Sequence, residues 1–139
     1  MPLRNSIHSC LLADTRVTDL IGTGSACRHY PRRAPQGAAA PYVVSQKIAG
    51  RPEQTHGTPG DAEDTMEEAL VQFSCIAATG DAADALCLAV RKAIMEDVGQ
   101  VLATAHITAT SPDTRDAEED AVDLHVAQVD ITFFHNPQT

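Results

Sequence analysis

Three side chains near the C-terminus have types that could support acid–base chemistry. His106 lies in a β-prone segment, and Asp123 and His125 lie two residues apart in the next one. If the two strands of a hairpin paired in the right register, an imidazole and a carboxylate would lie within proton-transfer reach. The alternative is a set of paired polar residues on an exposed sheet face. We favour that alternative, because a serine nucleophile elbow and a second carboxylate at a recognisable spacing are missing.

Metal and phosphate sites have weaker support. Cys27 and His29 are two residues apart and would need distant partners, since the downstream histidines are isolated and no CxxC or HxxxH pattern is present. The Gly-Thr-Gly-Ser segment at 22–25 could cradle a phosphate, but no Lys-Ser or Lys-Thr pair follows it. We therefore expect no catalytic residue, no metal site and no cofactor.

Length and composition indicate one domain with a hydrophobic core of modest size. A chain of 139 residues buries roughly two-thirds of its extended-chain surface on folding. Aromatic residues make up 4% of the sequence and tryptophan is absent, which favours two thin layers over a deep ligand cavity. The net charge of −9 opposes a basic nucleic-acid-binding face.

Two further features bear on the compartment. The N-terminal apolar run is interrupted by His8 and Asp14, which makes it too short and too polar for a signal peptide or a membrane span. The four cysteines are scattered through apparent core segments, which indicates reduced thiols rather than a disulfide framework. We therefore expect a protein made in the cytoplasm, with no membrane partner.

Hydrophobic periodicity predicts the elements that position these side chains, in the order α-β-β-α-β-β. The segments are an N-terminal helical segment at 1–22, strands at 42–50 and 67–78, a second helix at 81–96 with Asp81 as its N-cap, and strands at 101–110 and 121–135. We expect a single α+β domain over 1–139. Its mainly antiparallel sheet has about four long strands, with the two principal helices packed on one face.

The connecting segments have polar, turn-rich compositions. Residues 51–66 combine prolines, glycines and acidic residues, which predicts a mobile loop. Residues 111–120 are expected to form a turn, with the acidic run at 116–120 exposed to solvent. In the last strand the apolar parity shifts, which a β-bulge near 127–128 or an error in the assumed register would explain.

The order of motifs at 28–51 and 70–94 is the most specific feature of the chain. HYP at 29–31 and APQG at 34–37 are followed by PYVVSQKIAGR at 41–51, and the β-prone run LVQFSCIAAT at 70–79 precedes the second helix. In this order the segments resemble those of the small tail-completion proteins of long-tailed phages, also called tail terminators or head–tail joining proteins. Gene-transfer particles use related parts.

The resemblance implies a structural role. Members of that family assemble as a ring, usually a homohexamer, that caps the head-proximal end of the tail tube and stops its growth. The implied partners are further copies of the chain, the tail tube protein and a head-completion, stopper or adaptor protein. Genome DNA would pass through the lumen only in transit. The implied location is the tail or neck of a virion, assembled in the host cytoplasm. The alternatives are a small monomeric enzyme or ligand-binding domain that uses His106, Asp123 and His125, or a tail assembly factor absent from the final particle.

Charged residues are the candidates for contacts between neighbouring subunits. Acidic and basic segments that are well separated in one chain can specify a head-to-tail contact. The candidate interface comprises three groups: Arg28, Arg32, Arg33 and Arg51; then Glu53, His56, Asp61, Glu63 and Asp64; then Glu118, Glu119 and Asp120.

Overall fold

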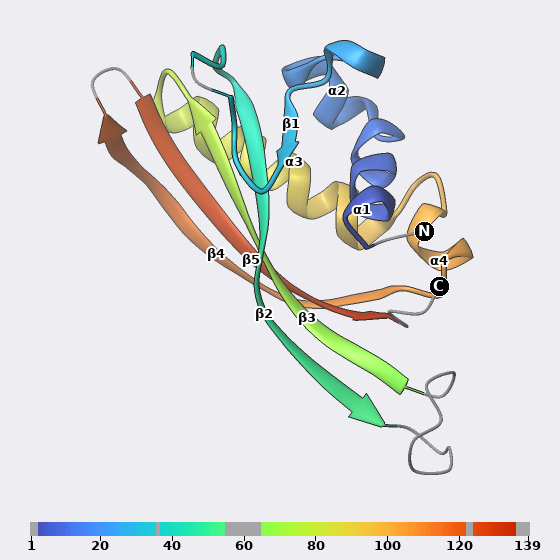
Figure 1. Ribbon diagram of the computed structural model, residues 1–139. Coiled ribbons are helices and arrows are strands. Elements are labelled where there is room, and N and C mark those ends of the chain that lie inside the picture. Colours follow the sequence, from blue (N-terminus) through green and yellow to red (C-terminus); the bar gives the residue numbers. More distant parts are fainter. Residues whose placement is uncertain (1–2, 36, 55–64, 122–123, 136–139) are drawn as a thin grey trace.

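The computed structural model describes residues 3–35, 37–54, 65–121 and 124–135, without the side chains at 51–54, 65–66, 111 and 119–121. Its elements follow one another along the chain as shown in Figure 1. They are α1 (Leu3–Leu12), α2 (Thr15–Ile21), the 3-10 turn η1 (Gly24–Ala26), β1 (His29–Pro31), β2 (Tyr42–Gln54), β3 (Thr65–Ala77), α3 (Gly80–Glu96), α4 (Val101–Thr104), β4 (Thr108–Ala121) and β5 (Leu124–His135).

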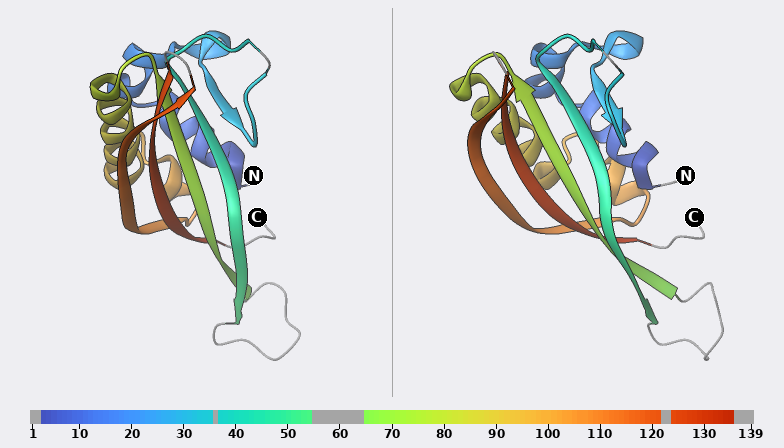
Figure 2. Two further views of the ribbon diagram at one scale, coloured as in Figure 1. Left: turned by 90° about the vertical axis from the view of Figure 1, so that its left-hand side faces the viewer. Right: turned by 60° about the vertical axis from the view of Figure 1, so that its left-hand side comes forward.

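The five strands form one sheet in the order β1-β2-β3-β5-β4. The short strand β1 runs parallel to β2, and all the other pairs are antiparallel. Figure 2 shows that the sheet curves around the helices, which all lie on one of its faces. The expected α+β class and the placement of the helices on one face are therefore confirmed.

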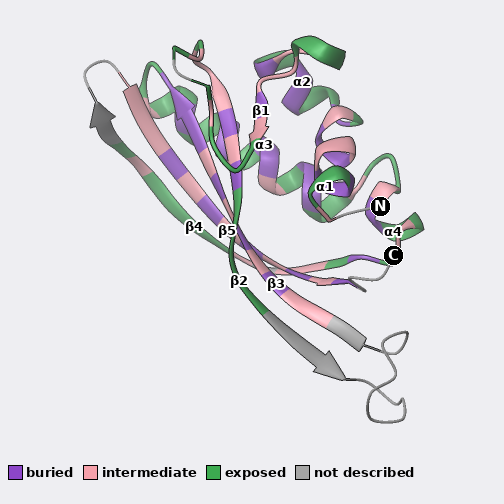
Figure 3. Cartoon of the chain, viewed as in Figure 1, coloured by how far each residue is buried: buried purple, intermediate pink, exposed green. Residues whose placement is uncertain are grey.

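The core lies between the helices α1, α2 and α3 and alternate residues of the sheet, above all of β3 and β5. Buried and half-buried positions alternate along β5, as Figure 3 shows, because successive side chains of a strand point to opposite faces. Phe73 of β3 and Phe133 of β5 are fully buried, and their ring centroids lie 6.3 Å apart. Leu86, Val90 and Ile94 recur along α3 at helical spacing and are buried against these strands.

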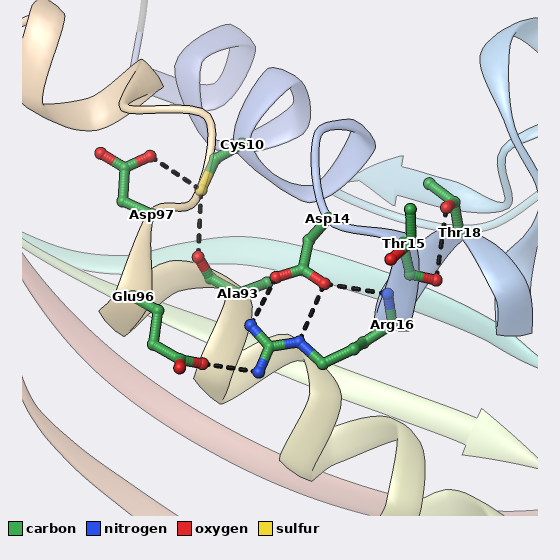
Figure 4. A network of polar contacts seen from close by, with 8 residues as sticks. All are labelled: Cys10, Asp14, Thr15, Arg16, Thr18, Ala93, Glu96 and Asp97. Atoms are coloured by element: carbon green, nitrogen blue, oxygen red, sulfur yellow. Dashed lines mark hydrogen bonds and ion pairs between the residues drawn. The ribbon is translucent and has the colours of Figure 1, made fainter.

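Asp14 and Arg16 together join α2 to α3, as Figure 4 shows. The Asp14 carboxylate caps α2 by accepting a hydrogen bond from the backbone N–H of Arg16 at 2.9 Å. The Arg16 guanidinium also pairs with Asp14 at 2.7 Å and with Glu96 of α3 at 2.6 Å. The hydrogen bonds from Arg16 lower the pKa of Asp14, so this link persists in mildly acidic solution.

Asp97, just beyond α3, organises the next turn of the chain. Its carboxylate accepts backbone N–H bonds from Val101 and Ala103, each at 2.9 Å, at the start of α4. The thiol of Cys10 lies 3.6 Å from the same carboxylate and 3.4 Å from the carbonyl of Ala93. Burial and the nearby Asp97 raise the pKa of Cys10 to about 12, so this thiol stays protonated.

The C-terminal half differs from the sequence-based expectation. Residues 101–104 form α4 instead of a strand, because Asp97 caps them, and 108–121 form β4 instead of ending in a turn. The predicted turn at 116–120 is therefore wrong, since Glu118 and Glu119 pair with β5, whereas the predicted exposure to solvent is confirmed for Asp116 and Glu118. Pro112 is tolerated because β4 is an edge strand and its ladder is irregular there, between Thr110 and Asp113.

Three smaller corrections concern the other strands and α3. The predicted loop at 51–66 is too long, because β2 continues to Gln54 and β3 begins at Thr65, while 55–64 lie outside the described residues. β5 itself has no extra residue at 127–128, since it stays in register with β3 from Glu67 to Ala77, and the irregularity opposite Ala127 belongs to β4, between Arg115 and Glu118. In β2 the register shifts between Lys47 and Ala49. Thr79, rather than Asp81, is the N-cap of α3.

The aromatic pair in the core gives a stability prediction. Replacing Phe73 with alanine should lower the free energy of unfolding by about 3–5 kcal/mol, because it removes a fully buried ring and leaves a cavity. Phe134→Ala is the matched control, since Phe134 lies one residue along from the core row and is only half-buried. Phe134→Ala should lower the free energy of unfolding by less than half as much as Phe73→Ala does. Urea unfolding of both variants measures the difference, and equal losses would show that the Phe73 ring does not anchor the core.

Candidate assembly surfaces

The three arginines that flank β1, Arg28, Arg32 and Arg33, differ in their contacts. Arg28 is held by the fold, because its guanidinium donates to the carbonyl of Pro41 at 2.8 Å and to that of Leu20 at 3.2 Å. Arg32 and Arg33 are exposed, and neither has an ion-pair partner in the part of the chain that the structure describes. The structure thus assigns Arg28 a structural role and leaves the other two available for contacts.

Arg32 ends β1 in an unusual backbone conformation. Its φ is +82°, in the left-handed region that favours glycine, and its N–H donates to the carbonyl of Ser45 at 2.7 Å. β1 ends beside β2 at Pro31, directly before this residue. Along the remainder of β2, from Gln46 onward, no described strand occupies the outer edge. The absence of a ladder partner there explains how β2 accommodates Pro52.

A cavity of about 330 Å³ lies between the start of α1, the end of β1 and the helix-covered face of the sheet. Leu3, Ile7 and Val71 supply its apolar lining, and Arg4 and Arg32 are its two unpaired cations within the described residues. We call it the Arg4/Arg32 cavity. Sequence patterns gave no indication of it, because its walls come from segments far apart in the chain.

A polar network closes one side of this cavity. Glu67 of β3 forms an ion pair with Lys47 of β2, and its Oε1 lies 3.2 Å from Nε2 of His135 in β5. The Lys47 ammonium lowers the pKa of Glu67, so its carboxylate stays ionised. All three residues occupy the inward-facing rows of their strands, beyond the apolar core. Continuing the period-two pattern past the core would have located them in the sequence.

A second polar chain links α1 to the sheet. Nδ1 of His8 lies 2.8 Å from Nδ1 of His29 in β1, and the two rings stack with centroids 5.0 Å apart. Nε2 of His29 lies 2.8 Å from the hydroxyl of Ser45 in β2. Burial and the neighbouring His8 lower the pKa of His29 to about 3. Sequence reasoning paired His29 with Cys27, whereas the structure gives it His8 as a partner.

Strand β4 carries the acidic candidates at the opposite edge of the sheet. Asp113, Asp116 and Glu118 are exposed, and none has an ion-pair partner among the described residues. The backbone N–H of Ala117 donates to the Asp84 carboxylate of α3 at 2.8 Å, which anchors this edge to the helix layer. The structure thus places unpaired carboxylates at one edge of the sheet and unpaired guanidinium groups near the other.

The histidines considered for acid–base chemistry do not form one site. His106 lies just before β4, whose first residue Thr108 pairs with Phe134, whereas His125 pairs with Glu119 at the other end of the hairpin. The two ends, at Phe134 and His125, are nine positions apart along β5, which corresponds to roughly 30 Å of strand. Asp123 lies outside the described residues. His106 and His125 therefore do not converge, which agrees with the sequence-based preference against an acid–base site.

Several interface candidates are not tested by the structure. His56, Asp61, Glu63 and Asp64 lie outside the described residues, and the side chains of Arg51, Glu53, Glu119 and Asp120 are not described. Among the described residues there is no group of three or more side chains suited to hold a metal ion. In the same residues no helix has the length and apolar character needed to cross a membrane.

Comparison with known proteins agrees with the resemblance in the sequence. A family model described as "Tail completion protein gp17" matches residues 5–136. Among solved structures, a chain of the "Virion of native gene transfer agent (GTA) particle" superimposes with a TM-score of 0.61 at 17% sequence identity, over 96% of this chain and 93% of that chain. At that identity the likeness shows a shared fold. No curated protein sequence matches the chain significantly.

The buried His29 predicts a pH dependence of stability. Since its folded pKa is about 3 instead of the ordinary 6.5, the unfolded chain binds a proton below pH 6.5 that the folded chain does not. Stability should fall by about 1.4 kcal/mol per pH unit between pH 6 and pH 5 from this group. His29→Gln should flatten that slope, and exposed His106→Gln should keep it. Urea unfolding across this range is the measurement, and equal slopes for wild type and His29→Gln would contradict the prediction.

Proposed function

Because the chain belongs to the tail completion protein gp17 family, and is thus a structural protein of a virion tail, we propose that it is the ring-forming terminator of the tail tube. In this role the copies cap the head-proximal end of the tube and join the tail to the head connector. The observation that carries the proposal is the family match over residues 5–136. The role is structural rather than enzymatic, and it needs no cofactor.

The two edges of the sheet suit a closed ring. A ring requires a heterologous contact, in which one surface of each copy meets a different surface of the next. The sheet ends in β1 and the free part of β2 on one side and in β4 on the other. These edges differ in charge, with unpaired Arg32 near the first and unpaired Asp113, Asp116 and Glu118 along the second. Different and complementary edges favour head-to-tail assembly over a symmetric dimer.

The long hairpin of β2 and β3 is the proposed contact with the next protein along the particle axis. Figure 1 shows this hairpin extending beyond the other strands and the helices. Its ladder continues to the pair of Gln54 and Thr65. A projecting hairpin can reach a neighbouring protein while the body of the domain stays in the ring. In the proposed assembly this hairpin contacts the tail tube or the head connector.

The sheet face without helices has a composition suited to DNA in transit. Three glutamines, Gln46, Gln72 and Gln128, lie on strands β2, β3 and β5 in the rows that point away from the core. On that face the guanidinium of Arg115 is paired with Asp130 at 3.0 Å. Arg33 lies beside a hollow of this face that Tyr42 and Gln128 line, and it is an unpaired cation there. Lys and Arg contacts supply most non-specific affinity for phosphates, so a wall with as few free cations as the described residues place here would let DNA slide. We assign this face to the lumen.

The two alternative functions, an enzyme and a tail assembly factor, differ in how well the structure supports them. A monomeric enzyme built on His106, Asp123 and His125 loses its basis, because the hairpin holds the two histidines at opposite ends. A tail assembly factor would share the same fold and the same contacts as a terminator. Only its absence from finished particles would distinguish it, which makes the protein composition of purified particles the deciding observation.

The proposed ring predicts the molecular mass of the protein in solution. Light scattering on the full chain, alone and then with its tail tube protein, should show a closed oligomer, with six copies of the 14.8 kDa chain as the expected number. Heterologous contacts close at a fixed number, so the mass should not grow with concentration once the ring is complete. A monomer under both conditions would contradict the proposal.

The projecting hairpin gives a second test. Deleting residues 53–63 and joining the ends with a short turn should leave the fold and the oligomer mass unchanged, because the core lies at the other end of the ladder. In particles assembled with this variant, tails and heads should accumulate separately. Electron microscopy and particle counts measure the effect. Normal particle yield would exclude the hairpin tip from joining, whereas unfolding of the variant would show that the tip belongs to the folded core.

A further inference from the structure

We propose that the Arg4/Arg32 cavity receives the acidic edge of β4 from a second copy of the chain, at Asp113 and Asp116. This inference rests on the proposed ring, and it names the two surfaces that meet in each contact. A head-to-tail pairing of this kind repeats from copy to copy, since every chain carries both surfaces on opposite sides of its sheet.

The charges in the cavity identify a carboxylate as the group that it binds. Lys47 is already neutralised by Glu67, which also faces His135, so these residues add no free cation. Arg4 and Arg32 have no such partner among the described residues, and they approach the cavity from α1 and from the end of β1. A guanidinium binds a carboxylate in a bidentate geometry that fits both charge and shape. The apolar lining would reduce solvent screening of such pairs.

The position of Arg32 is fixed by the fold rather than by its own side chain. Its N–H is bonded to the Ser45 carbonyl, and its backbone lies in the left-handed region at φ +82°. A non-glycine residue in that region costs roughly 1 kcal/mol or more. Glycine would avoid this cost, but it would leave the cavity with only one unpaired cation. The strain therefore accompanies a charged group held at the cavity mouth.

The acidic edge of β4 lies at the right height to reach this cavity in a neighbouring copy. Gln46 of β2 pairs with Gln72, Gln72 pairs with Asp130, and Asp130 pairs with Asp113 of β4. Asp113 is thus on the same rung of the sheet as Gln46, whose neighbours Ser45 and Lys47 line the cavity. A neighbour placed beside the sheet along this rung brings its acidic edge level with Arg32. Since Asp113 opposes Asp130 of the helix-free face, the neighbour must also be rotated about the strand direction so that its carboxylate turns toward the helix-covered face, where the cavity lies.

Chain-level charge favours the same contact. The chain has 19 acidic and 10 basic residues and a net charge of −9, so copies brought together repel unless carboxylates meet cations. The exposed carboxylates of β4 and the unpaired arginines of the cavity supply such a match. An acidic segment of the tube or connector protein is the competing occupant, and the experiment below separates the two.

Charge reversal tests the contact in the full chain. Arg4→Glu/Arg32→Glu should weaken self-association by roughly tenfold or more, because like charges would face each other. An acidic residue near the start of α1 complements the helix dipole, so the fold should tolerate the change. Arg33→Glu is the matched control, since Arg33 is an equally exposed and unpaired neighbour that does not line the cavity. It should associate as wild type does.

The reciprocal change identifies the occupant. Asp113→Arg/Asp116→Arg should weaken association on its own, and combining it with the arginine reversals in one chain should restore the ring. Failure of the combined variant to recover, while wild type forms rings, would overturn the cavity contact and leave the ring intact. Reversals that spare the ring mass but abolish binding of the tube or connector protein would assign the cavity to that protein. A wild type that stays monomeric with and without the tube protein would reject the ring and the contact together.

A crosslink gives a readout that does not depend on affinity. Within one chain Arg32 and Asp113 lie at opposite edges of the five-stranded sheet, roughly 19 Å apart, which is too far for a disulfide. In a Cys27→Ser background, Arg32→Cys/Asp113→Cys should therefore crosslink only between copies and yield a ladder of covalent multimers. Asp113→Cys alone should give dimers at most. The absence of a ladder from rings of normal mass would contradict the proposed contact.

Discussion

The unbroken register between β3 and β5 is the constraint on which the rest of the structure depends. From Glu67 to Ala77 each residue of β3 opposes one residue of β5 without a bulge, so the inward rows of both strands stay aligned. That alignment brings Phe73 and Phe133 together under α3 and places Glu67 beside His135 at the end of the same rows. A slip of one residue would turn the inward row of one strand outward, which would separate Phe73 from Phe133 and Glu67 from His135.

The elements with strong periodicity could be predicted from the sequence, and those that depend on tertiary contacts could not. The helix at 80–96 and the pairing of β2 with β3 follow from regular apolar spacing. In contrast, α4 has only four residues and depends on hydrogen bonds to the Asp97 carboxylate. β4 is an edge strand, and its charged residues and Pro112 give it the composition of a turn. Local composition does not distinguish an exposed edge strand from a loop, because neither is required to bury apolar residues.

The same limit applies to the candidate surfaces. Counting charges located Arg28, Arg32 and Arg33 correctly as a cluster in the sequence, but it could not show that Arg28 is occupied by two carbonyl groups of the fold. The cavity at Arg4 and Arg32 joins α1, β1 and three further elements, so no sequence window contains it. The contact between His8 and His29 could not be predicted for the same reason, since the two residues are 21 positions apart in the sequence.

The three register shifts in β4 have a consequence for the proposed role of ending the growth of a tail tube. They fall between Thr110 and Asp113, between Arg115 and Glu118, and between Glu119 and Ala121, so the free edge of the strand has no long regular row of donors and acceptors. A regular edge would be a template on which further strands could be added without limit. An irregular, charged edge recognises a specific neighbour through side chains and is a poor surface for fibre growth. In the proposed ring, the irregular pairing thus disfavours open-ended addition of strands at this edge.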